Sequence, residues 1–290
     1  MVIRVTPADD LQAVFDGAPA GSTIRLEPGI YRQKLMIRTS DLTLIGSGAE
    51  ETVIVYDDHA KKPHPIGWEY NTFRTYTLAV CADGVTVKDL TVANDAGSPK
   101  EKGQEVALSV VADGFQMENC HLISTQDTLF LGPLPSDLIG RYEGFLLDPL
   151  RRGGTLRQSF RNCRIDGSVD FIFGCGVAEF ENCQICSVYD EGRIGFVAAP
   201  SHGLIQQEGF HFRNCSFTAE ETVEQGSVYL ARPWRDHGIS RFENCSYGTH
   251  IAPEGFDKWN DTCRDRTARF FEEPEVAGRV SWVNRIEKAR

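Results

Sequence analysis

Long apolar stretches are missing from this 290-residue chain, and this absence narrows its class. No run of 18 or more apolar residues occurs, which excludes a membrane-spanning helix. The opening residues, MVIRVTPADD, lack the basic and then apolar pattern of a secretory signal. We therefore expect a cytoplasmic protein, or a secreted one if a leader has been removed.

Motifs for metal, redox or serine chemistry are also missing. The seven histidines show no H-E-x-x-H or other metal spacing, and the G-x-S-x-G of serine hydrolases is absent. One C-x-x-C runs from Cys183 to Cys186, but no second pair follows and no βαβ pattern surrounds it. We expect neither a metal nor a cofactor.

The chain has few basic residues: 41 acidic residues outnumber 30 basic ones and give a net charge of −11. This balance argues against nucleic acid or an anionic membrane as a partner. The nine cysteines are odd in number, and five of them sit in repeated structural words. A disulfide framework is therefore not expected, and a reducing compartment is favoured.

The sequence does contain a repeated four-residue motif, F-x-N-C, which we call the repeated word. It occurs at residues 160–163, 180–183, 212–215 and 242–245, and a looser copy ends at Cys120. The cysteines lie 43, 20, 32 and 30 residues apart, a spacing typical of stacked repeats. Side chains alternate along a strand, so Phe160, Cys163 and Ile165 can all point inward only if the chain bends at Asn162. Asparagine tolerates the left-handed conformation that such a bend needs.

Two short strands that meet at a bent asparagine, once per turn, describe a coil of an all-β parallel β-helix. The asparagines of successive coils could stack as a hydrogen-bonded ladder. The ends fit this fold, because residues 6–16 predict a capping helix that starts after Thr6. The polar tail after Trp259 is expected to pack along the coils. No linker is visible, so we expect a single domain over residues 1–290.

Two aspartates lie at the same distance after their cysteines. Asp127 comes seven residues after Cys120, and Asp170 comes seven residues after Cys163. The Gly- and Pro-rich segment 132–154 is interpreted as a loop inserted into one coil. The two carboxylates would then lie on neighbouring rungs, with backbones about 4.8 Å apart. One is expected to stay protonated while the other ionises, as in an acid/base beside a nucleophile.

A ladder of solvated acids is the alternative interpretation of this spacing. Asp190 also lies seven residues after a cysteine of the repeat, but Glu191 and Gly192 follow it. We therefore expect Asp190 in an exposed turn. The residues around Asp127 and Asp170 are more apolar, which favours the paired-carboxylate interpretation.

Further short sequence motifs along the chain resemble those of the pectin methylesterases, or pectinesterases. LTLIGSG, GQEVAL, QDTL, DFIFG, YLARPW and RVSW occur in the family's order and span nearly the whole chain. The resemblance implies a right-handed, single-stranded parallel β-helix. It also implies hydrolysis of galacturonate methyl esters, in pectin or in methylated oligogalacturonides, without a cofactor.

The resemblance also implies roles for single residues. Asp170 matches the nucleophile that forms an acyl-enzyme, and Asp127 matches the general acid and base. Gln104 and Gln126 are similar to the glutamines that hydrogen-bond the oxyanion. Arg232 resembles the arginine that keeps the nucleophile ionised and oriented.

Aromatic residues that contact sugar rings in the family match Phe173 and Trp234. Plain alternation places Phe173 opposite Asp170, so the strand must bend or bulge near Ile172 if both side chains face the cleft. Segment 132–154 leaves the coil close to Asp127, and we expect it to overhang and narrow the cleft.

Other functions stay open. A pectate lyase or a polygalacturonase would share the β-helix, but the calcium-binding acids of the first and the denser aspartates of the second are not evident. A non-catalytic carbohydrate-binding β-helix and an esterase for another acyl ester are further alternatives. The net charge predicts a preference for heavily methylated, nearly neutral stretches. The missing signal pattern predicts a short methylated oligogalacturonide as the target. Oligomeric state and processivity are left open.

Overall fold

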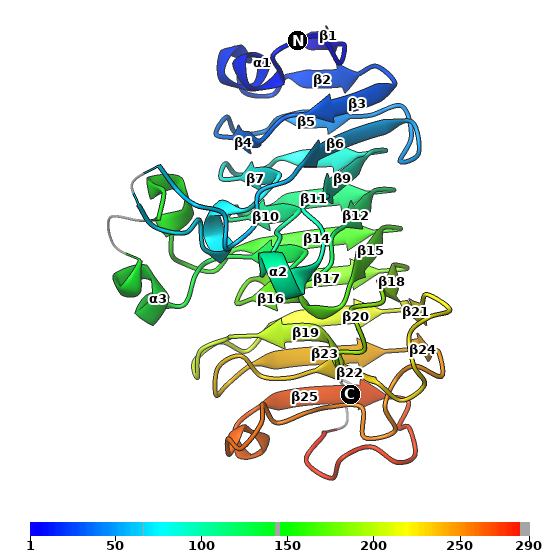
Figure 1. The fold of residues 1–290 in the computed structure, drawn as a ribbon. Coiled ribbons are helices and arrows are strands. Elements are labelled where there is room, and N and C mark those ends of the chain that lie inside the picture. Colours follow the sequence, from blue (N-terminus) through cyan, green and yellow to red (C-terminus); the bar gives the residue numbers. More distant parts are fainter. Residues whose placement is uncertain (66, 143–145, 285–290) are drawn as a thin grey trace, which may run out of the picture.

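The computed structural model describes residues 1–65, 67–142 and 146–284. The chain winds into a stack of coils that forms a parallel β-helix, with the N-terminus at one end of the stack (Figure 1). Within these ranges, the paired strands are all parallel and belong to three sheets. The predicted fold class is confirmed.

The first sheet contains β1 (Val2–Val5), β2 (Thr23–Leu26), β5 (Thr43–Ile45), β8 (Thr86–Lys88), β11 (Phe115–Glu118), β14 (Arg157–Arg161), β17 (Val177–Glu181), β20 (Phe210–Arg213), β23 (Ile239–Glu243) and β25 (Arg269–Glu273). The second sheet contains β3 (Gly29–Arg32), β6 (Thr52–Tyr56), β9 (Thr91–Asn94), β12 (His121–Ile123), β15 (Arg164–Gly167), β18 (Gln184–Ser187), β21 (Ser216–Ala219) and β24 (Ser246–Tyr247). The third sheet contains β4 (Leu35–Ile37), β7 (Leu78–Val80), β10 (Leu108–Val110), β13 (Leu129–Leu131), β16 (Val169–Gly174), β19 (Gly195–Pro200) and β22 (Val228–Ala231).

Three α-helices and three 3-10 helices lie outside these sheets within the described ranges. They are α1 (Leu11–Gly17), α2 (Pro99–Lys102) and α3 (Ser136–Arg141), and the 3-10 turns Thr72–Arg74, Asp148–Arg151 and Arg264–Arg266. In the part of the chain that the structure describes, no helix has the length and apolar character needed to cross a membrane.

The bend predicted at the repeated word is confirmed. The word's asparagines all have φ between 53° and 55°, at Asn119, Asn162, Asn182, Asn214 and Asn244. Each lies between a strand of the first sheet and the next strand of the second sheet. The left-handed residue turns the chain by one corner of the coil, which lets the residues on both sides of it point inward.

The predicted asparagine ladder is present at its N-terminal end. Asn119 Nδ2 donates to Asp89 Oδ1 over 3.0 Å, and Asn162 Nδ2 lies 3.5 Å from Asn119 Oδ1. Asp89, with φ of 55°, occupies the same corner one coil earlier. An aspartate therefore starts the ladder that the asparagines continue.

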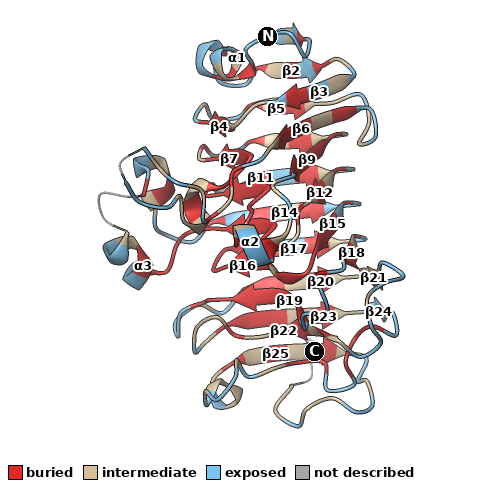
Figure 2. Cartoon of the chain, in the orientation of Figure 1, coloured by how far each residue is buried: buried red, intermediate tan, exposed pale blue. Residues whose placement is uncertain are grey.

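The phenylalanines of the repeated word form a continuous stack inside the coils. The Phe160–Phe180, Phe180–Phe212 and Phe212–Phe242 ring pairs lie 4.9, 4.6 and 5.0 Å apart, with interplanar angles of 9° to 13°. The word's cysteines are free thiols that pack in the same core. Figure 2 shows that buried residues follow the strands along the stack. Identical residues in register thus build the interior.

The N-terminal helix caps the stack, but it begins later than the sequence predicted. Its N-cap is Asp10, whose carboxylate accepts from Ala13 N, and not Thr6. Thr6 instead donates its backbone N–H and its hydroxyl to Asp9, which closes a separate turn and delays the helix. Leu11 and Phe15 are buried against the first coils.

The C-terminal tail adds the strand β25 and then packs on the last coil. The Trp282 ring lies 6.3 Å from that of Phe256 and 5.6 Å from that of Phe270. The last six residues of the predicted tail, 285–290, lie outside the described residues.

The third sheet is covered on its outer face as well as its inner one. A second apolar cluster, which includes Phe73, Phe130, Leu138, Leu150 and Phe173, is separate from the interior core. Segment 132–154 supplies part of this cover and carries α3, which projects beside the stack in Figure 1. The apolar cover holds the side chains on this outer face in place, so the uncovered part of the face can carry a fixed site.

Candidate active site

A cleft of about 270 Å³ lies over the outer face of the third sheet. Six of the seven predicted site residues line it: Gln104, Gln126, Asp127, Asp170, Phe173 and Trp234. The seventh, Arg232, is bonded to Asp170. The fold therefore brings residues from four separate segments of the chain to one place.

The register of the third sheet sets the two aspartates side by side. Gln126 pairs with Val169 and Leu129 with Ile172, so Asp127 and Asp170 occupy matching positions on neighbouring rungs. Asp127 N donates to Val169 O over 3.1 Å. The inserted segment 132–154 thus leaves and rejoins one coil, as the spacing predicted.

Both aspartates have backbone conformations that are rare outside glycine and asparagine. Their φ angles are 64° at Asp127 and 50° at Asp170. The register of β16 shifts between Val169 and Ile172, so the predicted irregularity lies at Asp170 itself. Phe171 and Ile172 both enter the interior core, whereas Phe173 joins the outer cluster. This strained geometry turns the carboxylates toward the cleft, and such strain is typical of functional sites.

Arg232 donates two parallel hydrogen bonds to the Asp170 carboxylate. Nε lies 2.8 Å from Oδ1 and Nη2 lies 2.7 Å from Oδ2, and both side chains are 14% exposed. Burial raises the pKa of Asp170, and the guanidinium opposes that rise. Bidentate pairing fixes the plane of the carboxylate as well as its charge.

Two aromatic rings hold the guanidinium of Arg232. Its carbon lies 3.7 Å from the ring centroid of Phe196 and 4.1 Å from that of Trp259. Phe196 belongs to β19. This strand lies between β16, which carries Asp170, and β22, which Arg232 directly follows. The arginine therefore crosses one strand, on an aromatic support, to reach its carboxylate.

Asp127 is buried beside this ion pair, with 8% of its surface exposed. Burial and then the negative charge of Asp170 raise the pKa of Asp127 well above its ordinary range. The charges of Arg232 and Arg193 and a hydrogen bond from Gln126 counter part of this rise. Of the two carboxylates, Asp127 is therefore the one that favours its protonated form, and Asp170 has the arginine that favours its ionised form.

The two glutamines border the aspartates from different segments. The side chain of Gln126 hydrogen-bonds Asp127, and its Oε1 accepts from both terminal nitrogens of Arg193 over 3.3 Å. Gln104 follows α2 and lines the cleft. Amides that line the cleft can donate to an oxygen that gains negative charge.

The aromatic residues differ in what they offer to the cleft. Phe173 is only 3% exposed and packs between the rings of Phe130 and Trp234, at 5.1 and 5.8 Å. Trp234 is half-buried and presents a larger surface. Trp234 therefore offers more surface to the cleft than Phe173 does, and the Phe173 ring supports it.

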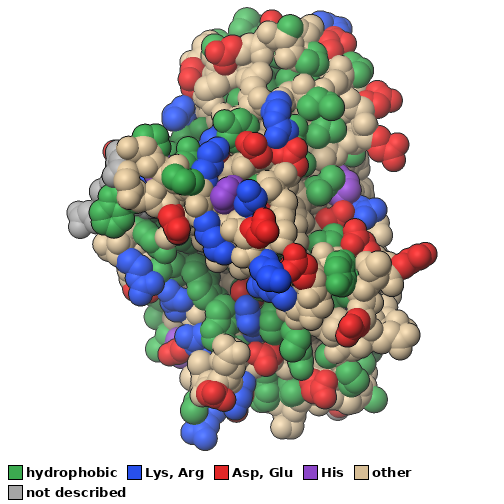
Figure 3. All heavy atoms as spheres, in the orientation of Figure 1, with side chains coloured by type: hydrophobic (Ala, Val, Ile, Leu, Met, Phe, Trp, Pro, Cys, Tyr) green, Lys and Arg blue, Asp and Glu red, His purple; other side chains and the backbone are tan. Residues whose placement is uncertain are grey.

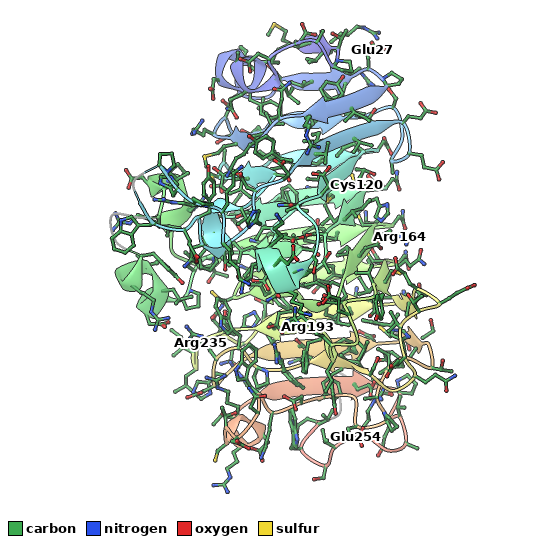
Figure 4. All side chains as sticks on the ribbon, viewed as in Figure 1. Glu27, Cys120, Arg164, Arg193, Arg235 and Glu254 are labelled. Carbon is green, nitrogen blue, oxygen red and sulfur yellow. The ribbon has the colours of Figure 1, made fainter. Side chains whose placement is uncertain are left out.

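The inserted segment forms one wall of the cleft. Leu138, Arg141 and Tyr142 line it from α3 and the residue that follows. Asp137 accepts from Arg235 over 2.8 Å, which ties α3 to the segment that carries Trp234. Figure 4 shows Arg235 on the side of the stack that faces α3.

The prediction of an exposed Asp190 is wrong. This residue is 5% exposed, and its Oδ2 accepts from Ser168 Oγ over 2.8 Å and lies 3.1 Å from Arg193 Nη1. Glu191 and Gly192 do form the exposed turn, but the chain folds Asp190 inward before it. The sequence reasoning also missed Arg193 and Glu105, the buried neighbour of Gln104.

No group of three or more His, Cys, Asp or Glu side chains within the described ranges could hold a metal ion.

A sequence model of the family described as Pectinesterase matches residues 5–133 and 152–287. The chain belongs to the pectinesterase family. The unmatched stretch between these ranges falls inside segment 132–154, which is the wall of the cleft described above.

Curated relatives carry pectinesterase names. Pectinesterase 31 of Arabidopsis thaliana is 31% identical over 90% of this chain and 77% of its own length. Probable pectinesterase/pectinesterase inhibitor 64 of the same plant is 28% identical over 95% of this chain. The match spans 46% of that second protein, so the chain covers about half the length of some pectinesterases that it resembles.

Solved structures of pectin methylesterases share the fold. The enzyme from carrot superposes with a TM-score of 0.83 at 23% identity, over 99% of this chain and 88% of its own. A mutant pectin methylesterase in complex with a hexasaccharide superposes with a TM-score of 0.78 at 25% identity, over 96% of this chain and 88% of its own.

Proposed function

We propose that this pectinesterase hydrolyses the methyl esters of galacturonate residues, releasing methanol and a free carboxylate. The observation that carries this proposal is the pair Asp127 and Asp170 on neighbouring rungs, with only Asp170 held by a bidentate arginine. Membership of the family and the names of its relatives support the ester substrate.

In the first half of the proposed reaction, an oxygen of ionised Asp170 attacks the ester carbonyl carbon. The bond from that carbon to the methoxy oxygen breaks, and Asp127 gives its proton to the departing methanol. Asp170 is then joined to the galacturonate as a mixed anhydride. The raised pKa of Asp127 favours the protonated form that this step requires.

In the second half, Asp127 is a carboxylate and accepts a proton from water. The hydroxide so formed attacks the acyl carbon, and the bond to Asp170 breaks. Asp170 returns to its ion pair with Arg232, which stabilises it as a leaving group. Asp127 is protonated again, and the product acid loses its proton to solvent.

The amides of Gln104 and Gln126 are assigned to the oxyanion of each tetrahedral intermediate. Both side chains line the cleft. Neutral donors suit this task because they stabilise the developing charge without adding a cation that would bind the free carboxylate product.

The walls of the cleft and a structural relative support this substrate class. The pectin methylesterase solved with a hexasaccharide is a structural relative, and Trp234 offers an aromatic platform for a sugar. Figure 3 shows Lys and Arg side chains interspersed with Asp and Glu side chains on the face that carries α2 and α3. Arg141 and Arg235 line the cleft itself, so overall charge does not argue against a partly de-esterified substrate.

A panel of substrates tests the proposal. Methylated hexagalacturonide is incubated with the protein and methanol is measured, while acetylated oligosaccharides are assayed in parallel for acetate. Methanol release supports the proposal. Acetate release without methanol would assign another acyl ester, and sugar binding without either product would assign a carbohydrate-binding role.

A further inference from the structure

Arg193 connects the cleft to a buried carboxylate behind it. Nη1 lies 3.1 Å from Asp190 Oδ2, and both Nη1 and Nη2 lie 3.3 Å from Gln126 Oε1. The Asp190 side chain is 2% exposed and also accepts from Ser168 Oγ. Figure 4 shows Arg193 on the front of the stack below α2.

These contacts determine which end of the Gln126 amide faces Asp127. An amide has one accepting oxygen and one donating nitrogen. Because Arg193 takes the oxygen, the nitrogen is left to donate to Asp127 and to an oxyanion. A flipped amide would present its oxygen to the developing negative charge, which would be repulsive instead of stabilising.

The loop that carries Arg193 is itself tied to the segment of the second glutamine. Glu191 Oε1 accepts from Ser98 Oγ over 2.9 Å, and its Oε2 lies 3.4 Å from Lys100 Nζ. Ser98 and Lys100 belong to the start of α2, and Gln104 follows that helix. One short loop thus contacts the segments that position both amides.

We infer that Arg193, held by Asp190, is a positioning residue that keeps the Gln126 amide oriented for oxyanion stabilisation. This inference rests on the proposed esterase function. Arg193 acts through Gln126 and is not itself assigned a contact with the reacting atoms. Its positive charge also counters the raised pKa of both Asp127 and Asp170, which gives its removal a second signature.

A double-mutant cycle tests the inference. Arg193→Met, Gln126→Ala and the double variant are compared in methanol release from methylated hexagalacturonide. We expect Arg193→Met to lower kcat about 10- to 100-fold, less than the roughly 100- to 1000-fold loss when an oxyanion donor is removed outright, with little change in KM. In the Gln126→Ala background the same substitution should cost less than about 3-fold, because the amide through which it acts is gone.

Equal losses in both backgrounds would overturn the inference, as would an unchanged kcat in Arg193→Met. If the wild-type protein released no methanol, the proposed function would fail instead, so the two failures are distinguishable. Should Arg193→Met fold poorly, Asp190→Asn keeps the shape of the anchor and is expected to lower kcat in the same background-dependent way.

Two further variants separate positioning from a merely structural role. Arg193→Lys keeps the charge but not the two-nitrogen fork, so it should preserve the acidic limb of the kcat/KM profile while kcat stays low. Arg193→Met should move that limb to higher pH. Arg164→Met is the matched control, because Arg164 pairs with buried Asp166 over 2.8 Å and lies outside the cleft. It should leave kcat and the pH profile unchanged.

Discussion

Replacement of Glu105 by glutamine should stabilise the protein increasingly as the pH rises from 5 to 8. Glu105 is 1% exposed, and its Oε1 has no hydrogen-bond partner among the described residues. Burial, and then the nearby charge of Asp190, raises the pKa of Glu105 to about 8 from an ordinary value of 4.5. The folded protein therefore keeps a proton there that the unfolded chain releases.

The sign and size follow from this difference. Between the two pKa values the folded state binds more protons than the unfolded state, so the contribution of Glu105 to stability falls as the pH rises. Each unit is worth about 1.4 kcal/mol, which amounts to about 3 kcal/mol by pH 7. Glutamine has a similar shape and does not titrate, so Glu105→Gln removes this penalty.

Denaturant unfolding of the wild type and Glu105→Gln at several pH values measures the effect. The difference in free energy of unfolding should grow by about 1.4 kcal/mol per pH unit in this window. Glu101→Gln, on the exposed face of α2, is the control and should show no such slope. A constant difference between wild type and Glu105→Gln would refute the argument.

Three other outcomes are expected. Arg232→Lys should lower kcat/KM by about 10-fold or more and move its acidic limb to higher pH, because the fork that holds Asp170 ionised is lost; an unchanged limb would contradict this. Phe180→Ala, in the middle of the ring stack, should cost about 3–5 kcal/mol of unfolding free energy, measured by denaturant titration; a loss below 1 kcal/mol would indicate that the stack collapses around the gap. Asn162→Ala should cost about 1–2 kcal/mol because φ is 54° there, whereas Asn162→Gly should cost less; equal losses would show that the backbone angle is not the cause.

The repeated word made the fold predictable. A bend at each asparagine follows from the alternation of side chains and from one tolerant residue type, and both are local properties. Asp127 and Asp170 lie at equal distances from their cysteines, and segment 132–154 reads as an insertion. Together these two features predict that the aspartates lie on neighbouring coils. The helix start was misplaced because Asp9 competes for the N–H and hydroxyl of Thr6.

The parts that could not be predicted come from loops that carry no repeat. Trp259 and Phe196 support Arg232 from segments with no spacing that relates them to it. Asp190 was expected to be exposed because Glu191 and Gly192 follow it, yet the loop turns inward to meet Ser168 and Arg193. A pattern of residue types reports average burial, whereas such a loop is set by a few specific polar contacts.

The most direct test of the proposed chemistry is methanol release from methylated oligogalacturonides by the wild type and by Asp170→Asn. Asparagine keeps the shape of the side chain but removes the nucleophilic carboxylate that Arg232 holds. We expect steady methanol release by the wild type and almost no methanol release by a folded Asp170→Asn protein. Comparable release by both proteins would contradict the assignment of Asp170 as the nucleophile.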